Sequence, residues 1–342
     1  MLQLWIGRAG TGKSERILET MKRDCRTRGQ VLIVPEHVSH EAEVALCRAL
    51  GDTASRYAEV LSLRNLSGRV LGEVGGLSDF TLDGGGKLLT MRMALQEVGS
   101  SLHVFNNPSR RAAFLEQLVA LVDELYAYEI PPQELYAQVQ DVPGQEGDKL
   151  RDVALLYAAY DARLRSGGRD ARSRVQKLRD ALPQASYLRG KDVYFDGFSY
   201  FNKTEEGILL TALTQAESVT VTLLGDRSAT EIFQNALQQR QRLVRMAQQT
   251  GCRCTMEFME PAGNPPLAPL EKYFFGAAVP TREGGGDQVR LYEATSAYAE
   301  VEYVSAQIRQ MLRGGYRCRD IAVTARDLTE YAPVLEHIFA RD

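Results

Sequence analysis

The sequence predicts an α/β fold in which a parallel sheet carries a phosphate-binding loop and is interrupted by a helical insertion. Three observations predict it: a glycine-rich motif directly after an N-terminal apolar run, further β-branched runs separated by helical patterns, and a long central stretch with helical spacing only. Apolar runs of this kind are typical of parallel strands that helices cover on both faces. The fold class is therefore that of a P-loop nucleotide-binding domain.

The first elements are a strand over residues 2–6, a glycine-rich loop and a helix over residues 14–22. The loop sequence GRAGTGKS fits the pattern G-x-x-x-x-G-K-[ST] between a strand and a helix. Glycines let successive backbone N–H groups converge on an anion at the helix N-terminus. We therefore expect a nucleotide-phosphate site formed by Gly7, Arg8, Ala9, Gly10, Thr11, Gly12, Lys13 and Ser14.

Two polar residues of this motif have separate expected roles. Lys13 is expected to bridge the β- and γ-phosphates, and Ser14 to supply a hydroxyl ligand to Mg²⁺. Glycine-rich turns between a strand and a helix also occur as plain tight turns, but the complete motif in this context favours nucleotide binding. ATP and Mg²⁺ are therefore the expected cofactors.

Four further short apolar runs predict buried strands. They are rich in β-branched residues, end in polar residues and are separated in several places by helical patterns. They begin at Val31, Asp192, Val219 and Asp320. The segment RLYEAT, residues 290–295, is also strand-like.

The pattern over residues 77–186 is helical and predicts an insertion domain. The turn-rich segment DGGGK, residues 83–87, predicts a loop at this insertion. Aromatic residues recur here at helical spacing, which indicates helix core more than a base-stacking surface. They are Phe114, Tyr126, Tyr128, Tyr157 and Tyr160.

Composition and charge exclude several classes of protein. Of 342 residues, 44% are hydrophobic and 25% charged, as in ordinary globular proteins. The net charge of −3 provides no global basic field, so a nucleic-acid contact requires a local groove. No apolar run suits a membrane span and no signal peptide precedes the first strand, so we expect no membrane association and a cytoplasmic location. We expect free thiols at Cys25, Cys47, Cys252, Cys254 and Cys318.

The run DVYFDGF offers the second half of an ATP site. Asp196 follows its apolar residues, as a Mg²⁺-holding carboxylate at a strand end should. Gly197 stands where a hydrolysing helicase has the glutamate that orients water. Glu205 and Glu206, in the next helix, are weaker candidates for that role, and we assign no catalytic residue.

These motifs resemble, in order and spacing, the helicase-like N-terminal region of the AddB family. Its members are the second subunits of bacterial AddAB helicase–nucleases, which process double-strand DNA breaks. Asp-Gly-Phe in place of Asp-Glu is the family's own variant and separates it from active UvrD-like helicases. The matching stretches cover nearly the whole chain: GRAGTGKS, VLIVPEHVSHEAE, VLSLRNLSGRVL, DVYFDGFSYFNKTEEGIL and EVEYVSAQIRQMLRGGYRCRDIAVTARD.

The resemblance implies a superfamily 1 helicase fold. Residues 1–76 and 187–280 would form a RecA-like domain, residues 77–186 its helical insertion, and residues 281–342 the start of a second RecA-like domain that is cut short. Such a subunit binds ATP but is not the motor, and its partners are DNA and an AddA-type subunit. An iron–sulfur cluster and a nuclease are expected only in a C-terminal part beyond this sequence, so we expect little hydrolysis and no nuclease activity from this chain alone.

The resemblance also implies places of contact with single-stranded DNA. They are His37, His40, Ser62 and Arg64, although ordinary loop and cap residues occur at such positions equally often.

Two other hypotheses stay open from the residues alone. One is a stand-alone P-loop NTPase or small-molecule kinase, which the 183-residue interval from Lys13 to Asp196 fits poorly. The other is a purely structural subunit whose loop no longer binds nucleotide, which only a measurement of nucleotide binding can exclude.

Overall fold

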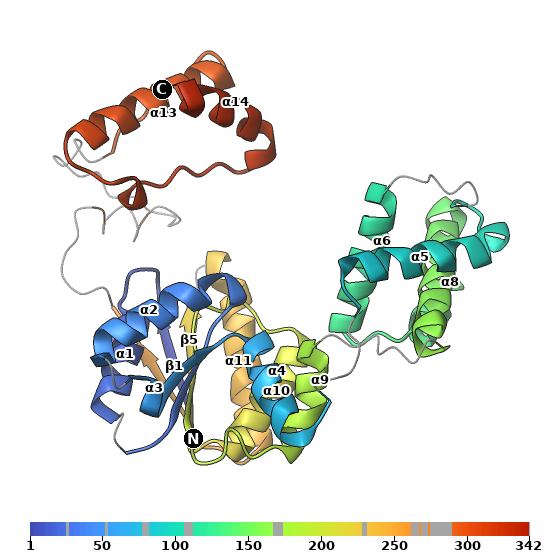
Figure 1. Ribbon diagram of the computed structural model, residues 1–342, viewed down its shortest axis with the longest axis horizontal. Coiled ribbons are helices and arrows are strands. Elements are labelled where there is room, and N and C mark those ends of the chain that lie inside the picture. Colours follow the sequence, from blue (N-terminus) through green and yellow to red (C-terminus); the bar gives the residue numbers. More distant parts are fainter. Residues whose placement is uncertain are drawn as a thin grey trace. The chain divides into compact units, whose positions relative to one another are not determined.

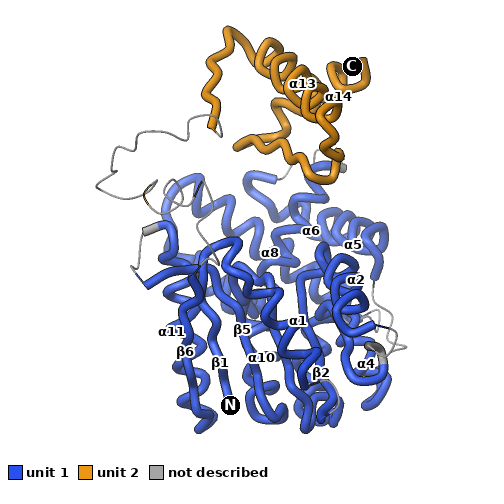
Figure 2. Tube along the Cα trace, turned by 90° about the vertical axis from the view of Figure 1, so that its left-hand side faces the viewer, with its two compact units in different colours: residues 1–264 blue, residues 265–342 orange. Residues whose placement is uncertain are grey.

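The chain forms two compact units, residues 1–264 and residues 265–342 (Figure 2). The computed structural model describes residues 1–24, 27–51, 54–76, 82–105, 112–166, 174–227, 231–260, 267, 273 and 289–341. The segments 261–266 and 281–288, rich in proline and in glycine respectively, lie outside the described residues.

The first unit contains a six-stranded, all-parallel sheet with the strand order β3-β2-β4-β5-β1-β6. Its strands are β1 (Leu2–Gly7), β2 (Gln30–Ile33), β3 (Ala58–Leu61), β4 (Asp192–Phe195), β5 (Ser218–Leu224) and β6 (Cys254–Phe258). The predicted strands near the N-terminus and at Val31, Asp192 and Val219 are therefore confirmed, whereas the two edge strands β3 and β6 were not predicted. Because all strands run the same way, the loops that follow them lie along one edge of the sheet.

Helices cover both faces of this sheet (Figure 1). On one face Ile17 and Met21 pack with Trp5 of β1, and on the other face Leu4 and Ile6 of β1 join a larger core. Alternate residues of one strand thus serve two cores, as the strand geometry requires. The first face carries α1 (Lys13–Asp24) and α2 (Ser39–Leu50), and the second carries α4 (Leu63–Val74), α9 (Arg174–Ala181), α10 (Lys203–Gln215) and α11 (Gln234–Gln249). The short helix α3 (Ala54–Tyr57) precedes β3.

A third core, separate from the two that flank the sheet, lies in the helices of residues 84–166, between β3 and β4. It is formed around Met91, Leu118, Leu156 and Tyr157. The helices of this segment are α5 (Gly84–Val98), α6 (Ala112–Ala127), α7 (Pro132–Val139) and α8 (Gly144–Ser166). The insertion range 77–186 stays a prediction, although α9, which falls inside it, packs with the sheet.

Two expectations for the insertion are wrong. The segment DGGGK is not a loop: its glycines open α5, because the Asp83 carboxylate caps the helix by accepting a hydrogen bond from the Gly86 N–H at 2.7 Å. Tyr128 is not core, since 42% of it is exposed. α6 ends at Ala127, so Tyr128 lies one residue beyond the helical periodicity that made it look buried. The other four aromatic residues of the stripe do join the core.

The Asp152 carboxylate holds the backbone of residues 103–105, which follow α5. It is 2% exposed and accepts hydrogen bonds from the backbone N–H groups of His103, Val104 and Phe105 at 2.7–3.0 Å. A buried charge of this kind is tolerated because several donors stabilise it. One side chain on α8 therefore fixes the position of residues 103–105.

The described part of the second unit consists of α13 (Ala297–Arg313) packed against α14 (Leu328–Arg341), with a 3₁₀ turn, Cys318–Asp320, between them. The strands predicted at Asp320 and at residues 290–295 are absent from the described residues. These segments have no neighbouring strand to pair with in the described part of this unit, and Leu291 is 99% exposed.

Two further expectations concern the whole chain. Cys47, Cys252, Cys254 and Cys318 are free thiols as predicted, while Cys25 lies outside the described residues. Among the described helices, none combines the length and apolar character that a membrane crossing requires.

We predict that Asp152→Ala lowers the free energy of unfolding by about 3 kcal/mol, because three backbone N–H groups lose their buried acceptor. Urea denaturation measures this change. The matched control is Asp148→Ala on the same helix, whose partly exposed pair with Arg151 is worth about 0–1 kcal/mol. Equal losses in the two variants would contradict the role of Asp152.

Candidate functional site

A glycine loop, defined as residues 7–14, connects β1 to the first turn of α1. Gly10 and Gly12 have φ angles of +72° and +76°, which only glycine adopts readily. A side chain at Gly7 would clash with the Thr11 hydroxyl, which itself donates to the Arg8 carbonyl at 2.9 Å. The space around Gly10 is open, so the loop is tight at its base and accessible at its tip.

The Lys13 ammonium lies against the backbone of this loop. Its Nζ donates to the carbonyl oxygens of Gly7 at 2.8 Å and Arg8 at 2.7 Å. Burial lowers the pKa of Lys13, and the negative charges of Asp196 and Glu15 oppose that shift. A cation is therefore held at the centre of the loop, where an anion would meet it together with the N-terminus of α1.

The carboxylate of Asp196 meets the glycine loop through Ser14. The Ser14 hydroxyl donates to Asp196 Oδ2 at 2.6 Å, and Thr222 of β5 donates to Asp196 Oδ1 at 2.5 Å. The Asp196 N–H continues the sheet pattern by donating to the Ile33 carbonyl at 3.0 Å. The structure thus brings together two residues that the sequence predicts for one site. The sequence interpretation missed Thr222, although alternating threonines in VTVTLL already indicate a polar face of β5.

Arg8 turns away from the loop and binds the segment after β5. Its Nε and one terminal nitrogen lie 3.1 and 2.6 Å from Asp226 Oδ2, and its guanidinium lies 5.6 Å from the centre of the Phe233 ring. Such paired contacts fix the geometry of both partners. Arg8 therefore anchors the loop to the end of β5. Asp226, which the sequence interpretation also missed, is an acidic residue two positions after the end of β5.

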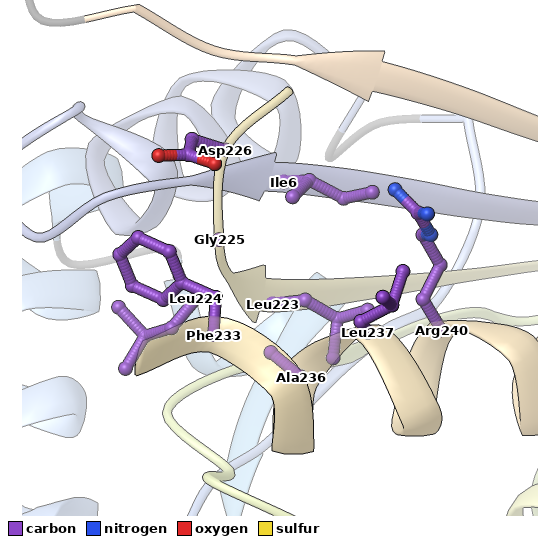
Figure 3. A pocket seen from close by; sticks show the side chains of 9 residues that line it. All are labelled: Ile6, Leu223, Leu224, Gly225, Asp226, Phe233, Ala236, Leu237 and Arg240. Atoms are coloured by element: carbon purple, nitrogen blue, oxygen red, sulfur yellow. The ribbon is translucent and has the colours of Figure 1, made fainter. Parts of the chain in front are cut away.

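A small cavity lies between the ends of β1 and β5 and helix α11 (Figure 3). Its volume is about 20 Å³, room for a single water molecule. Apolar side chains form most of its wall, and Asp226 and Arg240 are its charged residues. The cavity is too small for a nucleobase. Its lining is Ile6, Leu223, Leu224, Gly225, Asp226, Phe233, Ala236, Leu237 and Arg240.

Gly197, the residue after Asp196, has a left-handed backbone with φ of +80°. A Cβ atom there would lie 3.4 Å from Pro35 Cδ, in ordinary contact, so the backbone angle is the constraint. Residues with a Cβ atom are strained in this region. The position therefore lacks the carboxylate of a hydrolysing helicase and also has a backbone suited to glycine.

Glu205 and Glu206 are both engaged in other contacts. Glu205 forms a capping box at the start of α10, since its N–H donates to the Asn202 side chain at 2.9 Å and its carboxylate accepts from the Asn202 N–H at 3.0 Å. Burial raises the pKa of Glu205. Glu206 pairs with Arg242 of α11 at 3.3 Å. Both side chains thus have structural partners.

The residues expected to contact DNA divide into two groups. His37, His40 and Arg64 are exposed on segments that follow β2 and β3. Ser62 is 1% exposed, and its hydroxyl caps α4 by accepting from the Asn65 N–H at 3.2 Å. Ser62 therefore does not present its side chain to a ligand in this conformation, and the other three stay predictions.

Comparison with known proteins gives consistent matches. A family model described as ADDB, N-terminal matches residues 4–271. The B subunits of ATP-dependent helicase/deoxyribonucleases are similar: that of Pelotomaculum thermopropionicum is 33% identical over 98% of this chain, and that of Desulforudis audaxviator is 31% identical over 99%. That of Geobacillus thermodenitrificans is 29% identical over 99% of the chain. The chain spans 31% of the length of each of these relatives.

We predict that Gly197→Ala destabilises the protein by about 1 kcal/mol, because alanine is strained at positive φ. Gly68→Ala is the matched control: Gly68 lies inside α4 with open space at its Cβ position, so alanine should stabilise by about 0.5–1 kcal/mol. Opposite shifts of the urea midpoint are expected, and a shift of the same sign in both variants would refute the backbone argument.

Proposed function

The chain belongs to the AddB family, and from this membership we propose that it is an ATP-binding, non-motor part of a helicase–nuclease that processes double-strand DNA breaks for recombinational repair. The observation that carries the proposal is the meeting of Ser14 and Asp196 beside the glycine loop. Family membership weighs against a stand-alone kinase. The nuclease and an iron–sulfur cluster would lie in the part of the relatives that this chain does not cover.

The topology supports a RecA-like assignment of the sheet domain. From β1 the chain passes through α1 on one face to β2, and from β5 it passes through α11 on the other face to β6. In parallel sheets, ligands bind at the carboxyl ends of strands where successive connections diverge in this way. The glycine loop lies at that point, because it follows β1 directly.

The donor set fits a nucleotide triphosphate with a divalent cation. The ammonium of Lys13, the N-terminus of α1 and the backbone of the loop would hold the phosphates. Ser14 and Asp196 would hold Mg²⁺, which prefers hydroxyl and carboxylate oxygens. When bound, the cation would neutralise phosphate charge. The residues of this chain would bind the phosphates and the cation and fix their orientation.

The residue after Asp196 supports the non-motor assignment. Orientation of an attacking water usually requires a second positioned carboxylate or amide group. Gly197 has no side chain. Glu205 belongs to the capping box of α10, and Glu206 pairs with Arg242 of α11. ATP bound in this site would persist without efficient turnover.

The partners and the location follow from the family. The relatives are named as B subunits, so we propose an AddA-type subunit as the partner that supplies the motor. DNA is the proposed macromolecular ligand, with His37, His40 and Arg64 as exposed candidates for its contact. A repair subunit that acts on DNA would work in the bacterial cytoplasm.

We predict that Lys13→Ala weakens binding of ATP with Mg²⁺ at least tenfold, because it removes charge-assisted contacts worth about 1.5–3 kcal/mol. Isothermal titration calorimetry measures the affinity. Lys22→Ala is the matched control: Lys22 is an exposed lysine near the end of the same helix and should bind like the unaltered chain. An unchanged ATP affinity in the Lys13→Ala variant would contradict the proposed nucleotide site.

We also predict that this chain alone neither unwinds DNA nor releases phosphate above the level of its Lys13→Ala variant. The expected cause is the missing carboxylate at Gly197. A strand-displacement assay and a phosphate-release assay check this. Turnover that exceeds the Lys13→Ala blank and disappears in Asp196→Ala would overturn the non-motor assignment.

A further inference from the structure

Thr222 lies in the middle of the sheet, between the strand that leads to the glycine loop and the strand that leads to Asp196. β5 pairs with β1 on one side and with β4 on the other. Thr222 is opposite Trp5, and Val221 is opposite Phe195. The residue after Val221 is therefore level with Asp196, on the face that α1 covers.

Two hydroxyl groups hold the two oxygens of the Asp196 carboxylate, and their surroundings differ. Thr222 is 4% exposed and donates to Oδ1, whereas Ser14 is exposed and donates to Oδ2. Threonine is branched at Cβ, so few side-chain rotamers are open to it on a strand. Ser14 is unbranched and lies in the first turn of α1. The buried contact is therefore the fixed one, and the exposed contact is open to exchange with a ligand.

The same strand provides a comparison for this threonine. Thr220 lies two residues earlier on the same face and is 2% exposed. Its partner on β4 is Tyr194, so Thr220 lies two residues farther from the carboxyl ends of the strands than Thr222 does. The two threonines share chemistry, strand and burial, but only Thr222 is level with Asp196.

We propose that Thr222 is a positioning residue for the divalent-cation site: its hydroxyl holds Oδ1 so that Oδ2 stays directed at the Ser14 hydroxyl. The inference rests on the proposed binding of ATP with Mg²⁺. A group that orients a metal-binding carboxylate typically changes metal affinity by about 10- to 100-fold when it is removed. Thr222 should accordingly affect the part of nucleotide binding that depends on the cation and leave the cation-independent part unchanged.

The test compares ATP affinity in Mg²⁺ with ATP affinity in excess EDTA, by calorimetry on the whole chain. The ratio of the two dissociation constants gives the gain from the cation. Thr222→Val should lower this gain about tenfold while the EDTA affinity stays within about twofold. Thr222→Ser keeps the hydroxyl and should preserve the gain, and Thr220→Val is the control for a buried hydroxyl lost from the same strand.

Each outcome separates the inference from the proposed function. If Thr222→Val keeps the full gain, or Thr220→Val loses as much, the inference is overturned while ATP binding stands. The inference about Thr222 is also overturned if the unaltered chain binds ATP equally well with Mg²⁺ and with EDTA. If the unaltered chain binds no ATP in either buffer, the proposed function fails and the inference falls with it. Should Thr222→Val melt below the assay temperature, Thr222→Ala removes the same hydroxyl without adding a methyl group and is subject to the same criteria.

Discussion

The hydrogen bond between the Ser14 hydroxyl and the Asp196 carboxylate is the contact on which the candidate site depends. It joins residues 182 positions apart and forms only if β1, β5 and β4 are parallel neighbours with their ends level. The apolar cores on the two faces hold those strands in register. The cores therefore serve the site indirectly, because a slip of one residue would turn the Asp196 side chain to the opposite face.

Elements whose cause is local could be predicted from the sequence. The central strands are buried and rich in β-branched residues, and the glycine loop has its whole signal in eight consecutive residues. The edge strands were missed because an edge is partly exposed: β6 has an exposed middle, and the middle of β3 is only half-buried. The glycine run that opens α5 was misassigned as a loop, since one capping carboxylate outweighs the low helix propensity of the first turn.

Within the site, the residues that could be predicted belong to a recognisable sequence motif. The residues that were missed take part only because of how the strands pair. Ser14 and Asp196 follow from the chemistry expected beside a phosphate loop. Thr222 and Asp226 acquire their contacts because β5 lies between two strands that are remote in sequence, and a single sequence does not state that order. Ser62 shows the reverse case, because a position suggested by resemblance is occupied by the cap of α4.

The left-handed backbone at Gly197 also bears on how this site could change over generations. Under the proposed function, efficient hydrolysis would need a carboxylate there and, with it, a different path of the chain after β4, because the present path disfavours any side chain. A single substitution at Gly197 would supply the carboxylate, but the left-handed backbone would penalise the new side chain. If the proposal holds, both changes would be needed together, so the shape of the backbone would keep this site in a non-hydrolysing role as firmly as the absence of the acid does.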